Sequence, residues 1–145
     1  MEFFRTFKAP VTAEELTDTL TLERMPELCA SVASVSMTGP QECMATTVWG
    51  DFAIRREEVM GGARFYMPGC PNCLGWTITT DLPPDPDSIV IHCAINRPGH
   101  DPDFIASLED FADDWQEGLE DALGSDPPPS GPDEARSRPN LPGGT

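Results

Sequence analysis

Two short apolar runs flank a tight turn within residues 61–80, GGARFYMPGCPNCLGWTITT, and this stretch constrains the fold more than any other. In both runs apolar residues recur at every second position: Ala63, Phe65 and Met67, then Trp76 and Ile78. A period of two is typical of β-strands, whose successive side chains point to opposite faces. Proline favours the second position of a β-turn and asparagine the third, so Cys70-Pro71-Asn72-Cys73 is predicted to close a β-hairpin.

Two more segments have the composition of strands. Residues 43–55, CMATTVWGDFAIR, are rich in residue types that favour β-structure, with Gly50 as a predicted bulge. Residues 88–95, SIVIHCAI, form the most apolar run. Together with the hairpin, these segments predict four strands, at about residues 44–54, 63–68, 74–80 and 88–95. Short turns join the runs without an intervening helix, which indicates an antiparallel meander rather than parallel strands.

The region before these strands is predicted to be mainly helical. Residues 3–8, FFRTFK, fit either an edge strand or an extended arm. Thr12 and Glu15 have the spacing of a capping box, so a helix is expected from Thr12 to the low twenties. Pro26 suits the first turn of a second helix. Residues 30–37 fit either a continuation of that helix or a strand, and the helix is preferred because apolar residues recur there at helical spacing.

The strongest helical pattern covers residues 101–123. Asp101 suits the N-cap, Pro102 the first helical position, and Gly124 the residue after the last turn. Apolar residues recur between them at helical spacing and form one continuous stripe: Phe104, Ile105, Leu108, Phe111, Ala112, Trp115, Leu119, Ala122 and Leu123. Such a stripe must pack on another apolar surface, and one face of the sheet would supply it.

These elements predict one α+β domain over residues 1–124. It would contain an N-terminal helical region, a four-stranded antiparallel meander and a C-terminal amphipathic helix packed on one face of the sheet. Residues 125–145, SDPPPSGPDEARSRPNLPGGT, are rich in proline and glycine and have almost nothing apolar to bury. A disordered tail is therefore expected there.

The charge of the chain is strongly negative and much of it falls on this last helix. The formal net charge is −16. Residues 101–123 contain no basic residue but nine acidic ones: Asp101, Asp103, Glu109, Asp110, Asp113, Asp114, Glu117, Glu120 and Asp121. Such acidity argues against binding phosphate backbones over a broad surface, so no broad nucleic-acid binding is expected. The basic cluster Arg55, Arg56 and Arg64 is expected to pair with nearby glutamates or with this helix.

The preferred function is therefore a small acidic binding or inhibitory protein, of the adaptor or immunity type. It would present this helix face to a basic protein partner, because complementary charge speeds association and selects partners. Seven acids are the candidate partner-binding residues: Glu109, Asp110, Asp113, Asp114, Glu117, Glu120 and Asp121. The alternative is that the acids form a solvated, solubilising face with no partner.

The cysteines offer a second candidate function. The five cysteines follow no disulfide-scaffold spacing, which favours free or metal-bound thiols. In the predicted meander, Cys43, Cys70, Cys73 and His100 would lie at one end of the sheet, and three thiols with one imidazole can bind structural zinc. The alternatives are a redox-active thiol pair at Cys70 and Cys73, and an inert turn. A strand follows the pair, so no helix N-terminus is available to lower a thiol pKa.

The composition indicates less about location and catalysis. No run approaches the roughly 18 apolar residues that span a bilayer and no secretory signal is visible, so a cytoplasmic protein without membrane contact is expected. The spacing indicates no Ser/His/Asp arrangement and no glycine-rich phosphate loop, so no catalytic residue is predicted and an enzyme is the less favoured class. Zinc is the one cofactor considered, and the sequence leaves the oligomeric state open.

Overall fold

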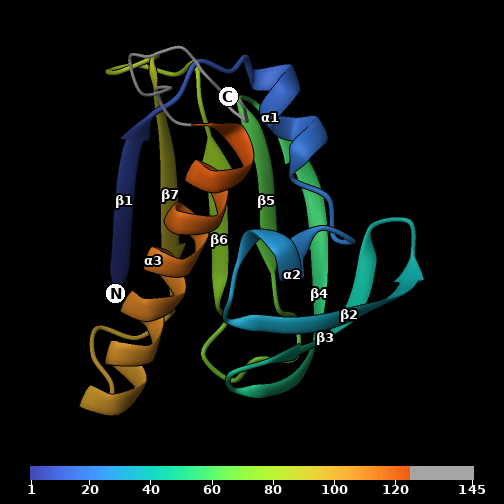
Figure 1. Ribbon diagram of the computed structural model, residues 1–145. Coiled ribbons are helices and arrows are strands. Elements are labelled where there is room, and N and C mark those ends of the chain that lie inside the picture. The colour runs from blue at the N-terminus through green and yellow to red at the C-terminus, as the bar shows by residue number, and fades with distance from the viewer. Residues whose placement is uncertain (125–145) are drawn as a thin grey trace, which may run out of the picture.

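The computed structural model describes residues 1–124, and the tail expected at residues 125–145 lies outside the described part. Its strands are β1 (Glu2–Lys8), β2 (Val32–Gly39), β3 (Glu42–Thr47), β4 (Gly50–Val59), β5 (Gly62–Tyr66), β6 (Gly75–Thr79) and β7 (Ser88–Ala94). They form one seven-stranded antiparallel sheet in the order β1-β7-β6-β5-β4-β3-β2 (Figure 1). Strands β2 to β7 therefore follow one another as a meander, and β1 extends the sheet beside β7.

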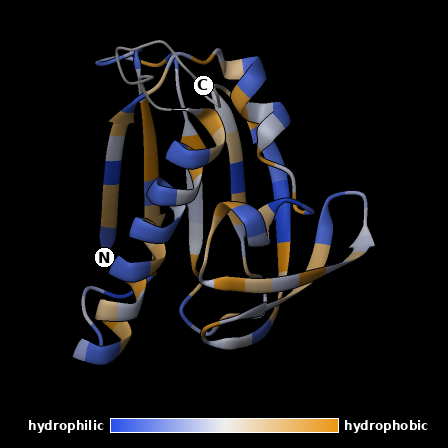
Figure 2. Ribbon diagram, in the orientation of Figure 1, coloured by the Kyte–Doolittle hydropathy of each residue, from blue (hydrophilic) through white to orange (hydrophobic). Residues whose placement is uncertain are grey.

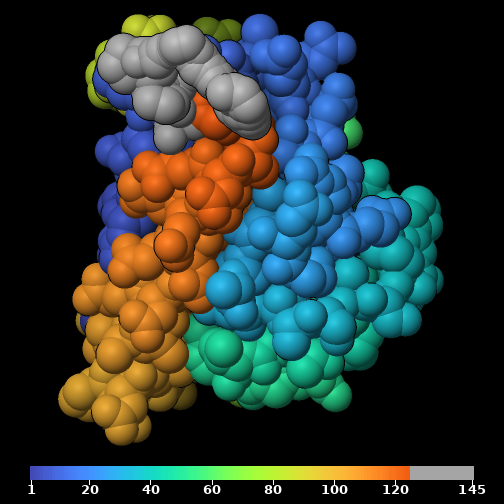
Figure 3. Space-filling model, viewed as in Figure 1, coloured from blue at the N-terminus to red at the C-terminus, as the bar shows by residue number. Residues whose placement is uncertain are grey.

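Three helices lie on one face of this sheet: α1 (Ala13–Thr19), α2 (Met25–Leu28) and α3 (Pro102–Leu123). The first two connect β1 to β2, while α3 runs along the sheet in front of β7 and β6 (Figure 1). In the space-filling view, α3 and the α1–α2 segment lie side by side and together cover this face (Figure 3). The prediction of an α+β fold with the C-terminal helix packed on an antiparallel sheet is confirmed. Within residues 1–124, no helix is long and apolar enough to cross a membrane.

The core lies between α3 and the sheet and is largely aromatic. Phe65 and Trp76 on the sheet, and Phe111 and Trp115 on α3, are all fully buried. The ring centroids of Trp76 and Phe111 are 4.9 Å apart, and those of Phe65 and Trp115 are 5.8 Å apart. Hydrophilic residues cover the outward side of α3 (Figure 2). Burial of each large side chain contributes about 1.5–3 kcal/mol, which outweighs the repulsion of a few tenths of a kcal/mol between neighbouring acids on α3.

The segment predicted as one strand at residues 43–55 is a hairpin. Strands β3 and β4 pair across it, with Thr47 opposite Gly50 and with Val48 and Trp49 in the turn. Gly50 has a φ of 114°, a backbone conformation that residues with a side chain rarely adopt, and this allows the chain to reverse. We predicted a bulge at this glycine because the residue types on both sides of it favour β-structure, whether they form one bulged strand or two strands of a hairpin.

Most of residues 30–37, predicted as a helix, belong to strand β2. Val35 lies opposite Ala45 on β3, and the alternation of serine and valine has the period of a strand. The ladder to β3 therefore overrides the weak helical spacing of this segment. Residues 3–8 are the edge strand β1 and not an extended arm. The sheet consequently has seven strands where four were predicted.

The predicted starts of α1 and α3 are confirmed. The Thr12 Oγ1 atom accepts a hydrogen bond from the Glu15 N–H at 3.0 Å, and the Glu15 carboxylate accepts one from the Thr12 N–H at 2.9 Å. At the start of α3, the Asp101 carboxylate accepts a hydrogen bond from the Asp103 N–H at 3.1 Å. Gly124 ends α3 in a left-handed conformation with a φ of 60°. Helix α1 ends at Thr19, slightly before the predicted boundary.

Helix α3 meets α2 at Gly118, where the two backbones are in direct contact. A Cβ atom at this position would collide with the backbone carbonyl of Leu28, the last residue of α2. Glycine is the one residue type without a Cβ atom, so it alone permits this approach. The contact fixes how closely α2 can lie against α3.

Arg56 on β4 binds the end of α1. Its Nη2 atom donates a hydrogen bond to the Thr17 carbonyl at 3.0 Å, and its Nε atom donates one to the Leu20 carbonyl. The last carbonyls of a helix lack partners within the helix, and the last turn of α1 has no basic residue of its own. Arg56 satisfies them from the neighbouring strand. Its predicted pairing with a nearby glutamate is also present, to Glu58 at 3.5 Å.

Candidate functional site

A pocket of about 170 Å³ opens where the start of α3 meets two turns of the sheet. The walls come from the β3–β4 turn and the start of β4, from the β5–β6 turn, and from the first turn of α3. The lining is apolar except for a thiol and one amide: Trp49, Phe52, Met67, Cys70, Pro71, Asn72, Leu74 and Phe104. A mostly apolar hollow with very few polar groups is the usual form of a small-molecule site.

Trp49 forms the wall on the β3–β4 side. Its indole Nε1 atom donates a hydrogen bond to Ser107 Oγ on α3 at 2.8 Å, and Ser107 Oγ donates one to the Phe104 carbonyl at 2.6 Å. The Trp49 ring lies 6.0 Å from the Phe104 ring and 5.2 Å from the Phe111 ring, measured between centroids. These contacts join the β3–β4 turn to α3 and hold both sides of the pocket in place.

The β5–β6 turn forms the opposite wall. The turn predicted at residues 70–73 is confirmed, since the Cys73 N–H donates a hydrogen bond to the Cys70 carbonyl at 3.0 Å. Asn96, just after β7, holds this turn from outside. Its N–H donates to the Asn72 carbonyl at 3.0 Å, and its side-chain Nδ2 donates to Cys73 Sγ at 3.5 Å.

Asn72 supplies the one amide of the pocket lining. Its side-chain oxygen is buried, and no group within residues 1–124 donates a hydrogen bond to it. A buried acceptor left without a donor costs about 1–3 kcal/mol. In the core, the indole N–H groups of Trp76 and Trp115 are also unpaired within this range. Of these three residues, Asn72 is the one that lines the pocket.

The zinc site predicted at Cys43, Cys70, Cys73 and His100 is not formed. Cys43 is fully buried within β3, opposite Ile54, and this burial raises the pKa of its thiol. Cys73 is exposed, and the His100 Nδ1 atom accepts a hydrogen bond from the next backbone N–H at 2.8 Å. Across the described residues, no group of three or more His, Cys, Asp or Glu side chains could hold a metal ion. The prediction assumed that residues 43–55 are a single strand.

The acidic face of α3 is partly neutralised by Arg5, which does not belong to the basic cluster Arg55, Arg56 and Arg64. Arg5 on β1 lies 3.2 Å from Glu109 and 2.6 Å from Asp113. Asp114 accepts a hydrogen bond from Ser31 Oγ at 2.6 Å. The remaining candidate acids without an ion pair in residues 1–124 are Asp110, Asp114, Glu117, Glu120 and Asp121. Three of these, Asp110, Glu117 and Asp121, are exposed.

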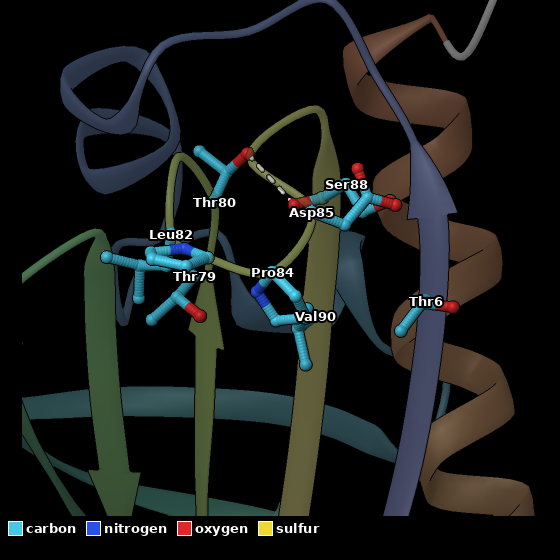
Figure 4. A pocket seen from close by; sticks show the side chains of 9 residues that line it. Thr6, Thr79, Thr80, Leu82, Pro84, Asp85, Ser88 and Val90 are labelled. Carbon is cyan, nitrogen blue, oxygen red and sulfur yellow. Dashed lines mark hydrogen bonds between the residues drawn. The ribbon is translucent and has the colours of Figure 1, made fainter.

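A larger pocket, of about 330 Å³, lies on the opposite face of the sheet beside the β6–β7 loop (Figure 4). Its lining residues are Thr6, Thr79, Thr80, Leu82, Pro83, Pro84, Asp85, Ser88 and Val90. Several of its polar groups already bind one another: Thr80 Oγ1 donates to the Ser88 carbonyl at 3.1 Å, and Ser88 Oγ donates to Asp85 at 2.7 Å. None of these residues has a buried side-chain nitrogen or oxygen atom that lacks a hydrogen-bond partner. The smaller pocket is therefore the better candidate for specific binding.

Sequence reasoning found one wall of the smaller pocket and missed the others. The Cys70-Pro71-Asn72-Cys73 turn was recognised from its own residues. Trp49 was assigned to the interior of a strand, and Phe104 to the apolar stripe of α3. A signal for Trp49 existed, because Gly50 directly after it could mark a turn as well as a bulge.

Comparisons with known proteins identify the fold. No protein-family model matches the sequence, and no curated protein matches it significantly. A START superfamily protein from Mycobacterium smegmatis is similar in structure, with a TM-score of 0.60 at 11% identity over 86% of this chain and 96% of that one. A protein of unknown function from Bacillus thuringiensis gives a TM-score of 0.62 at 12% identity over 85% and 98%. The protein XoxI from Bacillus cereus gives 0.60 at 12% over 84% and 94%. At these identities the likeness shows a shared START-like fold.

Proposed function

We propose that the START-like fold of this chain serves to bind a small, mostly apolar molecule that carries a hydrogen-bond donor. The observation that carries this proposal is an apolar pocket lined by Asn72, whose side-chain oxygen is buried and has no hydrogen-bond donor within residues 1–124. Few, convergent polar groups in an apolar lining orient a ligand, while the apolar area supplies most of the affinity. The similarity to a START superfamily protein supports the proposal at the level of fold.

The pocket limits the size and charge of the ligand. Its volume of about 170 Å³ is close to that of an engineered apolar cavity of about 150 Å³ that takes up benzene. A molecule with one or two fused rings therefore fits best. The net charge of −16 and the acids Asp101 and Asp103 near the pocket disfavour an anionic ligand. A neutral aromatic alcohol or amine matches these limits.

Phenol and its methyl ether, anisole, are expected to distinguish the role of Asn72. Phenol has an O–H donor and anisole has none, and a hydrogen bond contributes about 0.5–1.5 kcal/mol. The ratio of phenol affinity to anisole affinity should therefore fall by about two- to tenfold in the Asn72→Ala variant. NMR titration of backbone and indole N–H resonances measures both affinities, and the Trp49 indole resonance should be among those that shift most.

Two phenylalanine variants serve as a matched pair for this titration. Phe104→Ala removes a pocket wall and should weaken both ligands. Phe4→Ala removes a phenylalanine that is 54% exposed and stacks on His92 at 4.5 Å, away from the pocket, and should leave both affinities unchanged. Absence of saturable shifts around Trp49, or equal effects of the two variants, would contradict the proposal.

A second candidate function is docking of a basic protein partner on the acidic face of α3. It is supported by the exposure of Asp110, Glu117 and Asp121, which have no ion pair within residues 1–124. Fixed exposed charges of one sign attract an oppositely charged surface at long range and select against acidic ones. The alternative of a solvated face without a partner predicts no localised binding.

A triple neutralisation on α3 is expected to weaken binding of an eight-residue lysine peptide several-fold. The variant carries Asp110→Asn, Glu117→Gln and Asp121→Asn, and the affinity should also fall with salt because exposed charges are screened. The matched control carries Glu14→Gln, Asp18→Asn and Glu23→Gln, which remove the same charge from exposed positions elsewhere. Calorimetric titration measures the affinity of both variants for the peptide. Equal losses in the two variants would mean that the peptide responds to net charge and not to the α3 face.

A further inference from the structure

Two of the five cysteines differ sharply from the other three in their surroundings. Cys29, Cys43 and Cys93 are fully buried, and burial raises the pKa of each thiol, for Cys93 to about 12. Thiols held neutral in an apolar core react slowly. Cys73 is exposed and Cys70 is partly buried, and both are free thiols. Reaction with an oxidant is therefore directed to the Cys70–Cys73 pair.

The β5–β6 turn brings this pair within disulfide distance. The hydrogen bond from the Cys73 N–H to the Cys70 carbonyl, 3.0 Å long, fixes these residues as the first and last of a β-turn. Such residues have Cα atoms less than about 7 Å apart. A disulfide requires Cα atoms about 4.4–6.8 Å apart, so the turn needs little backbone movement to be cross-linked.

The two sulfur atoms lie in different environments in the thiol form. Cys70 lines the 170 Å³ pocket and packs against the hydrophobic core. Cys73 does not line the pocket, and its Sγ atom accepts the hydrogen bond from Asn96 Nδ2 at 3.5 Å. Between them lies Asn72, which lines the pocket and whose buried side-chain oxygen has no hydrogen-bond donor within residues 1–124. Joining the sulfur atoms therefore changes the pocket wall at Cys70 and restrains the backbone on both sides of Asn72.

We propose that Cys70 and Cys73 form an oxidation site whose disulfide weakens ligand binding in the adjoining pocket. The proposal rests on the proposed ligand-binding function of that pocket. On oxidation the Cys70 sulfur turns away from the pocket toward Cys73, so the ligand loses a wall contact. The cross-link also restrains the peptide that carries Asn72, which shifts its acceptor from the position that the free turn gives it.

The oxidant is a low-molecular-weight disulfide such as oxidised glutathione. The Cys73 thiol, which is the exposed one, loses its proton and attacks one glutathione sulfur, which breaks the glutathione disulfide and releases one glutathione thiolate. The Cys70 thiol then loses its proton and attacks the Cys73 sulfur of the mixed disulfide, which releases the second thiolate. The two protons pass through water to the two glutathione thiolates. The protein pair loses two electrons and glutathione disulfide gains them.

The test compares the same protein before and after treatment with oxidised glutathione. Peptide mapping by mass spectrometry should find a Cys70–Cys73 disulfide, with the protein two hydrogen atoms lighter and the three buried cysteines still reduced. Phenol affinity, measured by NMR, should fall about threefold or more and recover after a thiol reductant is added. The Cys73→Ser variant keeps Cys70 in the pocket wall, so its phenol affinity should be the same with and without oxidant.

Three outcomes would overturn the inference. They are failure of the disulfide to form, formation of a disulfide with a buried cysteine in its place, and unchanged phenol affinity in the fully oxidised protein. Failure of the reduced protein to bind phenol would contradict the proposed function separately. In that case the shift of the Trp49 indole resonance on oxidation decides the inference, because a reshaped pocket must move this resonance and an isolated turn disulfide leaves it in place.

Discussion

Replacing Gly118 with alanine is expected to lower the free energy of unfolding by about 1–2 kcal/mol. A Cβ atom here would collide with the Leu28 carbonyl, so α2 and α3 must move apart. Overpacking of this kind typically costs up to about 3 kcal/mol. The better helix propensity of alanine returns about 1 kcal/mol at most. The Cβ atom would meet the backbone of Leu28 and not the end of a flexible side chain, so a change of side-chain rotamer cannot relieve the clash.

Urea denaturation followed by circular dichroism measures this loss. The matched control is Glu117→Ala, an exposed neighbour on the same helix, which gains helix propensity without any clash and should change stability by less than about 0.5 kcal/mol. A Gly118→Ala protein as stable as the control would show that α2 does not rest on the α3 backbone.

Replacing Arg56 with methionine is expected to cost about 2–4 kcal/mol of stability. Methionine preserves much of the side-chain volume but leaves the Thr17 and Leu20 carbonyls at the end of α1 without their donors. Each buried acceptor left unsatisfied costs about 1–3 kcal/mol. The Arg56 residue is only 9% exposed, so water cannot easily replace the guanidinium.

Arg55→Met on the same strand is the control for this prediction. Arg55 has a side chain that is 53% exposed, and its partner Glu42 lies 3.6 Å away. Exposed ion pairs contribute about 0–1 kcal/mol, so this variant should be nearly as stable as the natural protein. Thermal unfolding of both variants at equal salt makes the comparison. Similar losses would mean that Arg56 acts through general charge and not through the carbonyls of α1.

The starts of α1 and α3 could be predicted because their signals are local. Thr12 with Glu15, and Asp101 with Pro102, act within one helical turn, and their chemistry is the same in any tertiary context. The turn at Cys70 to Cys73 was predictable for the same reason. Strand β2 was not, because serine and valine fit both a helix and a strand until the partner strand β3 is known.

The candidate site could be predicted only in part because its walls come from distant segments. Nothing local marks Trp49 as a neighbour of Phe104, and the two meet only when the β3–β4 hairpin folds toward α3. The zinc prediction failed for the same reason. The end of the sheet at which Cys43 lies depends on whether residues 43–55 form one strand or a hairpin, and they form a hairpin. The burial of the Asn72 oxygen is likewise a property of the assembled pocket and not of the turn.

Strand β1 influences the order in which the sheet can assemble. Its neighbour in the sheet is β7, with Phe3 opposite Cys93 and Phe7 opposite Ile89. Five strands and two helices separate β1 from β7 along the chain, so the backbone groups of β1 have no ladder to join until the meander is complete. Pairings between such distant segments require closure of a long loop and slow the folding of a chain. The hairpins from β2 to β7 are therefore expected to form first. Docking of β1 then occurs late, and it brings Arg5 into its ion pairs with Glu109 and Asp113 on α3.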